Sequence, residues 1–217
     1  KISVGATENA LMAACLAKGK TKLVNAAKEP EIVNLADCLN AMGAEISGAG
    51  SNTINILGVK KLFPTTHRVI SDRIEAGSFA IAAAITNGKL ELTNCNPLYL
   101  TSLSRILKRC GVSWESHENS VIISPKSRIQ SINIETEEYP GFPTDLQAQF
   151  MTLMCIANGN STISETIFEN RFLHVPELMR MGANITVKGS HAKVKGVRFL
   201  NGAPLMATDS RASISLI

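Results

Sequence analysis

The sequence has no long apolar run, no paired-cysteine motif and no basic cluster. No stretch reaches the roughly 18 to 20 apolar residues that a membrane-spanning helix needs, and no signal peptide is visible. The five cysteines are an odd number without CxxC spacing, which favours reduced, mostly buried thiols over disulfides or a zinc site. We therefore predict a cytoplasmic protein with no membrane partner, no metal and no cofactor.

The charges are nearly balanced. The 217 residues include 22 Lys and Arg against 18 Asp and Glu, which gives a formal net charge of +4, and no basic run is interleaved with aromatic residues. This pattern argues against a nucleic-acid partner and leaves room for anionic small molecules. Because 45% of the residues are apolar, the chain can bury a sizeable core in one large domain or two smaller ones.

One order of elements is repeated three times along the chain. Each copy has an apolar helix, a strand, a second helix and a strand pair. A glycine ends each helix, and the glycine pairs of the three copies are separated by 24, 23 and 23 residues: Gly19 and Gly43, Gly88 and Gly111, Gly159 and Gly182. The copies recur at a period of about 70 residues. This pattern predicts an α/β fold built from βαβαββ-like units, in which the first helix of each unit is buried.

Several boundaries follow from the repeat. In the first copy we expect a helix over 7–18 that Thr7 caps and that is buried on every side, a strand over 20–26 and a helix over 29–42. Residues 60–70 are a candidate crossover between two domains. The polar segment 126–140 joins the second and third copies, and its acidic run is interpreted as a solvated strand end. A fourth copy is expected to begin at 208.

An aspartate opens the buried helix of the third copy. Thr144 and Gln147 have the spacing of a capping box, which would start the helix at Asp145. Asp145 would then lie in the first turn, where unpaired N–H groups and the helix dipole favour a carboxylate. This position alone is typical of an ordinary helix start. The segments Ser71-Asp72-Arg73 and Thr208-Asp209-Ser210-Arg211 open in the same way.

Cations near these helix starts need an explanation. Arg73 and Arg211 oppose the helix dipole, which indicates a carboxylate partner or an anionic ligand. Arg171 stands between two phenylalanines, either as a surface arginine packed on rings or as a ligand for an anion. A packing or capping role is favoured for His174. Residues 1–7 have the layout of a phosphate cradle, a short strand leading through Gly5 into a helix.

At these residues the sequence resembles the enolpyruvyl transferases, and within them the branch that acts on UDP-N-acetylglucosamine. Six segments carry the resemblance, in order along nearly the whole chain: VGATENALMAA, EPEIVNLADCLNAMGAEI, SDRIEAGSF, FPTDLQAQF, TIFENRFLHVPELMRMGA and ATDSRAS. The resemblance implies an inside-out α/β barrel with two domains and buried helices. Residues 1–70 would then hold the last repeat of the first domain and the crossover, and residues 71–217 would belong to the second domain.

The resemblance also implies a reaction. The enolpyruvyl group of phosphoenolpyruvate would pass to the 3′-hydroxyl of UDP-N-acetylglucosamine with release of phosphate, in the first committed step of peptidoglycan synthesis. Asp145 would meet the sugar hydroxyl and accept its proton. The other implied substrate-binding residues are Lys1, Ile2, Ser3, Val4, Gly5, Ile167, Arg171, Asp209 and Arg211, and the residues implied to orient them are Glu29, Asp72 and Arg73.

The resemblance does not cover the whole family pattern. The family's first third, with its mobile loop and general acid, and its final arginine are not found in this sequence, so we expect the chain alone to be inactive. The sister enzyme acting on shikimate 3-phosphate is a rival that the wording of FPTDLQAQF and TIFENRF disfavours. A non-catalytic remnant, or a repeat scaffold that only binds nucleotide, is a rival from another class.

Overall fold

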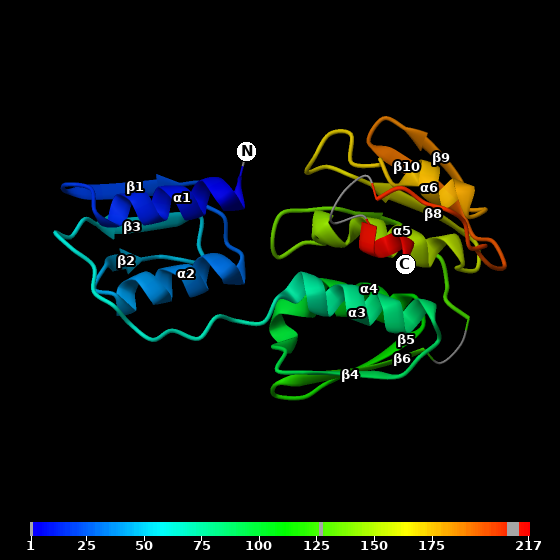
Figure 1. The fold of residues 1–217 in the computed structure, drawn as a ribbon, viewed down its shortest axis with the longest axis horizontal. Helices are drawn as coiled ribbons and strands as arrows, with labels where there is room; N and C mark the ends of the chain where they lie inside the picture. Colours follow the sequence, from blue (N-terminus) through cyan, green and yellow to red (C-terminus); the bar gives the residue numbers. More distant parts are fainter. Residues whose placement is uncertain (1, 126–127, 208–212) are drawn as a thin grey trace. The chain divides into compact units, whose positions relative to one another are not determined.

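The computed structural model describes residues 2–125, 128–207 and 213–217. It divides the chain into two compact units, unit 1 up to Ile70 and unit 2 from Ser71 (Figure 1). Each unit has an apolar core of its own. The assignment of the two units to successive domains of an enolpyruvyl transferase stays a prediction.

Unit 1 contains one copy of the repeat. Its three strands form an antiparallel sheet in the order β1-β3-β2, and α1 and α2 supply the rest of a core that includes Leu11, Ile32, Ile54 and Ile56. Residues 60–70 form neither helix nor strand. The elements are α1 (Val4–Cys15), β1 (Lys20–Val24), α2 (Pro30–Ala41), β2 (Glu45–Ser47) and β3 (Thr53–Leu57).

Unit 2 contains two further copies and a short additional strand. The second copy comprises α3 (Arg73–Ile85), β4 (Leu90–Thr93), η1 (Pro97–Leu100), α4 (Thr101–Arg109), β5 (Val112–Ser116) and β6 (Ser120–Pro125). After it come β7 (Ile134–Glu135), η2 (Thr144–Leu146), α5 (Gln147–Cys155), β8 (Asn160–Ser164), α6 (Val175–Arg180), β9 (Asn184–Lys188), β10 (His191–Lys195) and η3 (Ser213–Leu216). The sheets have the orders β4-β6-β5 and β7-β8-β10-β9, and β7 runs parallel to β8.

The three copies share one sheet topology, which confirms the predicted repeat. In each copy the last strand lies between the other two and pairs antiparallel with both. The third copy shows the complete βαβαββ order because β7 precedes α5. The predicted acidic strand end is also confirmed, because Glu135 ends β7 and is exposed.

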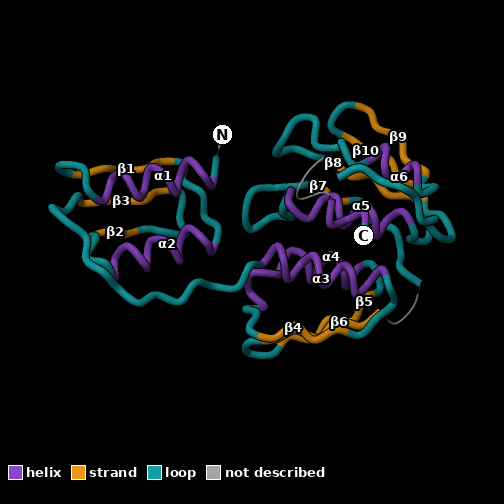
Figure 2. The backbone as a smooth tube through the Cα atoms, viewed as in Figure 1, coloured by secondary structure: helices purple, strands orange, loops and turns teal. Residues whose placement is uncertain are grey.

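The buried helices of unit 2 lie inside and its sheets outside (Figure 2). Every residue of α5 is buried, as the sequence predicts. Gln149 of α5 donates a hydrogen bond to Ser78 of α3 at 3.0 Å, and Leu146 lies where a Cβ on Gly77 would be. Both contacts lie in the first half of α3 and at the start of α5, and in Figure 1 the two helices each run from left to right, so α3 and α5 run in the same direction. Their N-termini therefore lie at the same end of unit 2.

The boundaries of the first helix differ from the prediction. It begins at Val4 rather than at residue 7, and the Ser3 hydroxyl caps it by accepting from the Ala6 N–H. Thr7 lies inside the helix, where its hydroxyl accepts a hydrogen bond of 3.0 Å from the Ala27 N–H. Nor is α1 buried on every side, since Met12 is 44% exposed. In unit 2 the first helices of the two copies, α3 and α5, cover each other. The described part of unit 1 holds one copy, so α1 has no second first-helix to cover it.

In the first and third copies, a glycine after the outer hairpin lets the chain return against the end of the copy's first helix. Val59 N–H donates to the Cys15 carbonyl at 2.8 Å, and Val197 N–H donates to the Cys155 carbonyl at 2.7 Å. A Cβ on Gly58 would overlap the Ala17 carbonyl, and one on Gly196 would overlap the Ala157 carbonyl. The same close approach of backbones thus occurs in the first and third copies.

Gly196→Ala should lower the free energy of unfolding by about 3 kcal/mol, because the methyl group meets backbone that cannot rotate away. Gly202→Ala is the matched control, since nothing lies within 4 Å of its Cβ position. Urea unfolding measures both. Equal stability of the two variants would contradict the close approach described here.

Candidate active site

The buried helix of the third copy begins differently from the predicted capping box. Residues 144–146 form a 3₁₀ turn, Pro143 occupies the N-cap position, and α5 follows from Gln147. The Thr144 hydroxyl donates to Glu165 Oε2 at 2.9 Å instead of capping the helix. Gln147 is buried. The capping box is therefore wrong, although Asp145 does lie in the first turn as predicted.

Asp145 and Arg171 form an ion pair at this helix start. Arg171 Nη2 lies 2.7 Å from Asp145 Oδ1, and Arg171 Nη1 donates to the Thr144 hydroxyl at 2.9 Å. The guanidinium also lies over the Phe168 ring, 4.8 Å from its centre. The side chains of Arg171 and Asp145 are 19% and 26% exposed, so water screens the pair less than it screens a pair at the open surface. The packing of Arg171 on an aromatic ring is thus confirmed, and its role as a ligand for an anion stays a prediction.

Beneath the pair lies a buried carboxylate that the sequence analysis missed. Glu165 is only 3% exposed and accepts four hydrogen bonds, two of them from the hydroxyls of Thr136 and Thr144. The other two come from the N–H groups of Ile167 and Phe168, at 2.9 and 3.1 Å. A buried carboxylate is tolerated when such donors surround it. The available signal was a glutamate directly after a half-buried strand, with a predicted arginine site nearby in the sequence.

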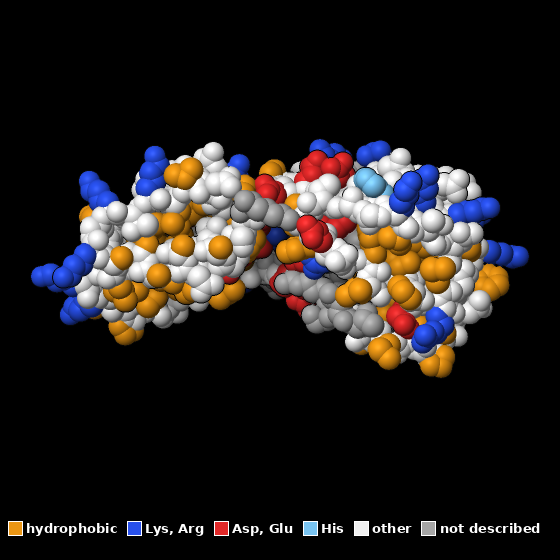
Figure 3. Space-filling view, turned by 90° about the horizontal axis from the view of Figure 1, so that it is seen from above, with side chains coloured by type: hydrophobic (Ala, Val, Ile, Leu, Met, Phe, Trp, Pro, Cys, Tyr) orange, Lys and Arg blue, Asp and Glu red, His pale blue; other side chains and the backbone are white. Residues whose placement is uncertain are grey.

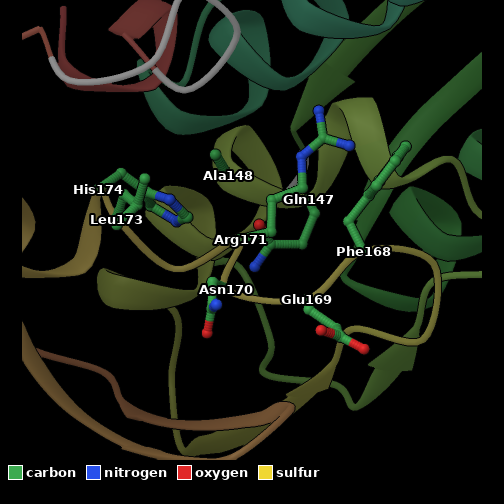
Figure 4. A pocket seen from close by; sticks show the side chains of 8 residues that line it. All are labelled: Gln147, Ala148, Phe168, Glu169, Asn170, Arg171, Leu173 and His174. Atoms are coloured by element: carbon green, nitrogen blue, oxygen red, sulfur yellow. The ribbon is translucent and has the colours of Figure 1, made fainter.

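A cavity of about 220 Å³ is lined by Arg171 of this pair. Figure 4 shows Arg171 between Phe168 on one side and the pair Leu173 and His174 on the other. The lining residues come from the start of α5 and from the loop after β8: Gln147, Ala148, Phe168, Glu169, Asn170, Arg171, Leu173 and His174. His174 is 1% exposed, directly precedes α6 and packs on the Phe172 ring, which agrees with its predicted packing role.

The start of α3 lies at the same end of unit 2. Asp72 caps this helix by accepting from the N–H groups of Ile74 and Glu75 at 2.7 and 3.2 Å. The Arg73 guanidinium lies over the Tyr139 ring, 5.4 Å from its centre. The Tyr139 ring is therefore one of the groups that stabilise the Arg73 cation, which the helix dipole disfavours at this position.

The predicted residues of unit 1 lie at the starts of its two helices. Ile2 and Ser3 lead directly into α1, which contains Val4 and Gly5, and the short strand predicted there is not formed because the helix begins early. Glu29 stands at the N-cap of α2 and is 8% exposed. Within the described part of the chain, its Oε2 atom has no hydrogen-bond partner. Three predicted residues, Lys1, Asp209 and Arg211, lie outside the described residues.

The surface charges, the metal-ligating side chains and the helix lengths bear on nucleic-acid binding, metal binding and membrane insertion. On the face drawn in Figure 3, the described Lys and Arg side chains project singly or in small groups. Among the described residues, no group of three His, Cys, Asp or Glu is placed to hold a metal ion. None of the described helices is long and apolar enough to cross a bilayer.

Four of the five cysteines are poor nucleophiles. All five are free thiols, and four of them are buried. Burial raises the pKa of Cys15 and Cys95, and it raises the pKa of Cys155 to about 12. Burial also raises the pKa of Cys110 to about 12, against a smaller opposing effect of the Arg109 charge. Reactivity needs the thiolate, which a raised pKa makes scarce. The fifth thiol, Cys38, is half-buried and is therefore the most accessible of the five.

The chain matches a protein-family model over residues 1–217; the model is described as EPSP synthase (3-phosphoshikimate 1-carboxyvinyltransferase). A crystal structure of the enolpyruvyl transferase NikO from Streptomyces tendae superposes with a TM-score of 0.86 at 26% sequence identity. That likeness covers 98% of this chain and 51% of NikO.

Two curated relatives give finer comparisons. The UDP-N-acetylglucosamine 1-carboxyvinyltransferase of Geobacter metallireducens is 58% identical over 215 residues, which are 99% of this chain and 52% of the relative. The UDP-N-acetylglucosamine 1-carboxyvinyltransferase 2 of Mesorhizobium japonicum is 55% identical, again over 99% of this chain and 51% of the relative. The chain thus spans about half the length of the curated relatives it matches.

In native protein at pH 8, we expect only Cys38 to react rapidly with a thiol reagent such as Ellman's reagent. A pKa of about 12 instead of 9 leaves Cys110 and Cys155 with about 10³-fold less thiolate at this pH, and their burial slows access further. The other four thiols should react after unfolding in guanidinium. Cys38→Ser should abolish the fast phase, and fast reaction of two or more thiols in native buffer would contradict the assignment.

Proposed function

Because the chain belongs to the EPSP synthase (3-phosphoshikimate 1-carboxyvinyltransferase) family, we propose that the full-length protein transfers the enolpyruvyl group of phosphoenolpyruvate to the 3′-hydroxyl of UDP-N-acetylglucosamine. The observation that carries the proposal is the 58% identity to a relative of that name over 99% of this chain. The product would enter peptidoglycan synthesis, and we propose that the protein acts in the cytoplasm.

Two acceptors are compared, 3-phosphoshikimate and UDP-N-acetylglucosamine. The family description names the reaction on 3-phosphoshikimate. The relatives that are 54 to 58% identical carry the name of the UDP-N-acetylglucosamine enzyme instead. Identity at that level over the whole chain favours the sugar nucleotide. Supplying the full-length protein with each acceptor separates the two.

The proposed reaction is an addition followed by an elimination. The sugar oxygen forms a bond to C2 of phosphoenolpyruvate, the hydroxyl loses its proton to a base, and C3 gains a proton, which gives a tetrahedral ketal. The bond from C2 to the phosphate oxygen then breaks, phosphate leaves and C3 loses a proton, so that the enolpyruvyl ether remains. The protein must therefore provide a base at the sugar hydroxyl and cations for two anionic substrates.

We assign the base to Asp145. Asp145 stands at a helix start beside the Arg171 guanidinium, which the Thr144 hydroxyl and the Phe168 ring hold in place. The orientation of the Asp145 carboxylate is therefore restrained before substrate binds. Arg171 would contribute positive charge, and the N-termini of α3 and α5 favour anions at the same end of unit 2.

The remaining assignments follow the family resemblance. Ile167 would contact the sugar, and the stretch from Lys1 to Gly5 would line the uridine diphosphate site. Asp209 and Arg211 would belong to the charged lining. The residues proposed to orient these groups are Glu29, Asp72 and Arg73. Because the relatives are about twice as long, we expect no turnover from the 217-residue chain alone.

In the full-length protein, Asp145→Asn should lower kcat by about 10²- to 10⁴-fold, because the amide keeps the shape of the side chain but cannot accept the hydroxyl proton. Phosphate release from phosphoenolpyruvate and UDP-N-acetylglucosamine measures the loss. Asp37→Asn is the control, since Asp37 is exposed on α2, and its kcat should stay within twofold of wild type. Near-normal turnover of Asp145→Asn would remove Asp145 from the mechanism.

A further inference from the structure

We propose that Glu165 and Thr144 are positioning residues that hold the Arg171 guanidinium against Asp145. Glu165 touches neither member of the ion pair in any hydrogen bond described above. It acts through the Thr144 hydroxyl, which donates to Glu165 Oε2 and accepts from Arg171 Nη1, both at 2.9 Å. The effect on turnover rests on the proposed function, whereas the effect on the geometry of Arg171 does not.

The direction of these hydrogen bonds carries the argument. A hydroxyl has one hydrogen to donate, and a guanidinium can only donate. Because the Thr144 hydrogen is committed to the Glu165 carboxylate, the oxygen presents its lone pairs to Arg171. The same guanidinium then reaches Asp145 Oδ1 with Nη2 at 2.7 Å. Two donors from one planar fork fix the plane of the guanidinium, as one contact alone would not.

Glu165 also fixes the loop that carries Arg171. Its Oε1 atom accepts the N–H groups of Ile167 and Phe168, and Phe168 is the residue on whose ring the guanidinium lies. One buried side chain therefore sets both surfaces that confine Arg171: the Thr144 hydroxyl and the Phe168 ring. This is why a glutamate, with two oxygens and room for four donors, suits the position better than an amide, which would present N–H groups to some of them.

A purely structural role is the alternative, and the chain offers a matched pair of residues to separate the two. Thr136 and Thr144 each donate a hydroxyl hydrogen bond to Glu165 at 2.9 Å, the first to Oε1 and the second to Oε2. Of these two hydroxyls, only that of Thr144 also accepts a hydrogen bond from Arg171. Thr136 instead accepts the Thr166 N–H at 2.9 Å, so it belongs to the joint between β7 and the end of β8.

The experiment compares Thr144→Val with Thr136→Val, each of which keeps the side-chain shape and removes one hydroxyl. The first readout is the NMR spectrum of the Arg171 guanidinium in the 217-residue chain, with Arg171→Lys used to assign its signals. In wild type the two hydrogen-bonded Nη groups should rotate slowly about their bonds to Cζ. Thr144→Val should speed this rotation at least tenfold, Thr136→Val should leave it unchanged, and Thr144→Ser should restore it.

The second readout is turnover by the full-length variants. Thr144→Val should lower kcat by about 10- to 100-fold, the range expected when a catalytic pair is displaced by a fraction of an ångström to one ångström. Thr136→Val should stay within twofold, although it also removes the acceptor of the Thr166 N–H and so costs at least as much stability. Unfolding midpoints of both variants, measured in urea, check that last point.

Each result of these measurements either supports or overturns the positioning role. Equal guanidinium rotation in Thr144→Val and wild type would overturn the positioning role, and so would equal disturbance by Thr136→Val. Should Thr144→Val fail to fold, Glu165→Gln replaces it, with the same faster rotation expected and unchanged rotation counting against the proposal. If the NMR results hold but the wild-type protein converts neither acceptor, the positioning role stands and the proposed function fails.

Discussion

The buried carboxylate of Glu165 is the constraint on which the candidate site depends. A carboxylate that is 3% exposed must find hydrogen-bond donors, and it takes them from its own loop and from two residues that lie 21 and 29 positions earlier in the sequence. The donors are Thr136 after β7, Thr144 at the start of the buried helix, and the N–H groups of the loop after β8. Satisfying this one group therefore brings together the segments that carry Asp145 and Arg171.

The repeat supplies the rigid frame around that constraint. In unit 2, α3 and α5 run in the same direction between two sheets, so both helix starts and their positive dipole ends lie at one end. Because α5 is buried along its whole length and Leu146 just before it is also buried, the 3₁₀ turn of residues 144–146 cannot move without disturbing the core. The Asp145 carboxylate on that turn is held more firmly than it would be on a surface loop.

Local patterns in the sequence predict much of this fold and less of the site. Matched glycine spacings predict the order of helices and strands, and the hydroxyl and aspartate at 144–145 correctly predict a helix start. The errors come from choices that local sequence leaves open. Ser3 and Thr7 are both good caps, and the Ala27 N–H decides between them by engaging Thr7. Thr144 is drawn away from the capping box by Glu165, which lies 21 residues further on. The pairing of Asp145 with Arg171, across 26 residues, is likewise a tertiary contact.

The central claim is that Asp145 meets the hydroxyl on which the reaction occurs. A crystal structure of the full-length protein with UDP-N-acetylglucosamine bound tests it most directly. We predict the sugar 3′-hydroxyl within about 2.6 to 3.2 Å of a carboxylate oxygen of Asp145, with Arg171 still bonded to both Asp145 and the Thr144 hydroxyl. A sugar bound with its 3′-hydroxyl out of reach of Asp145, directly or through one water, would contradict the claim.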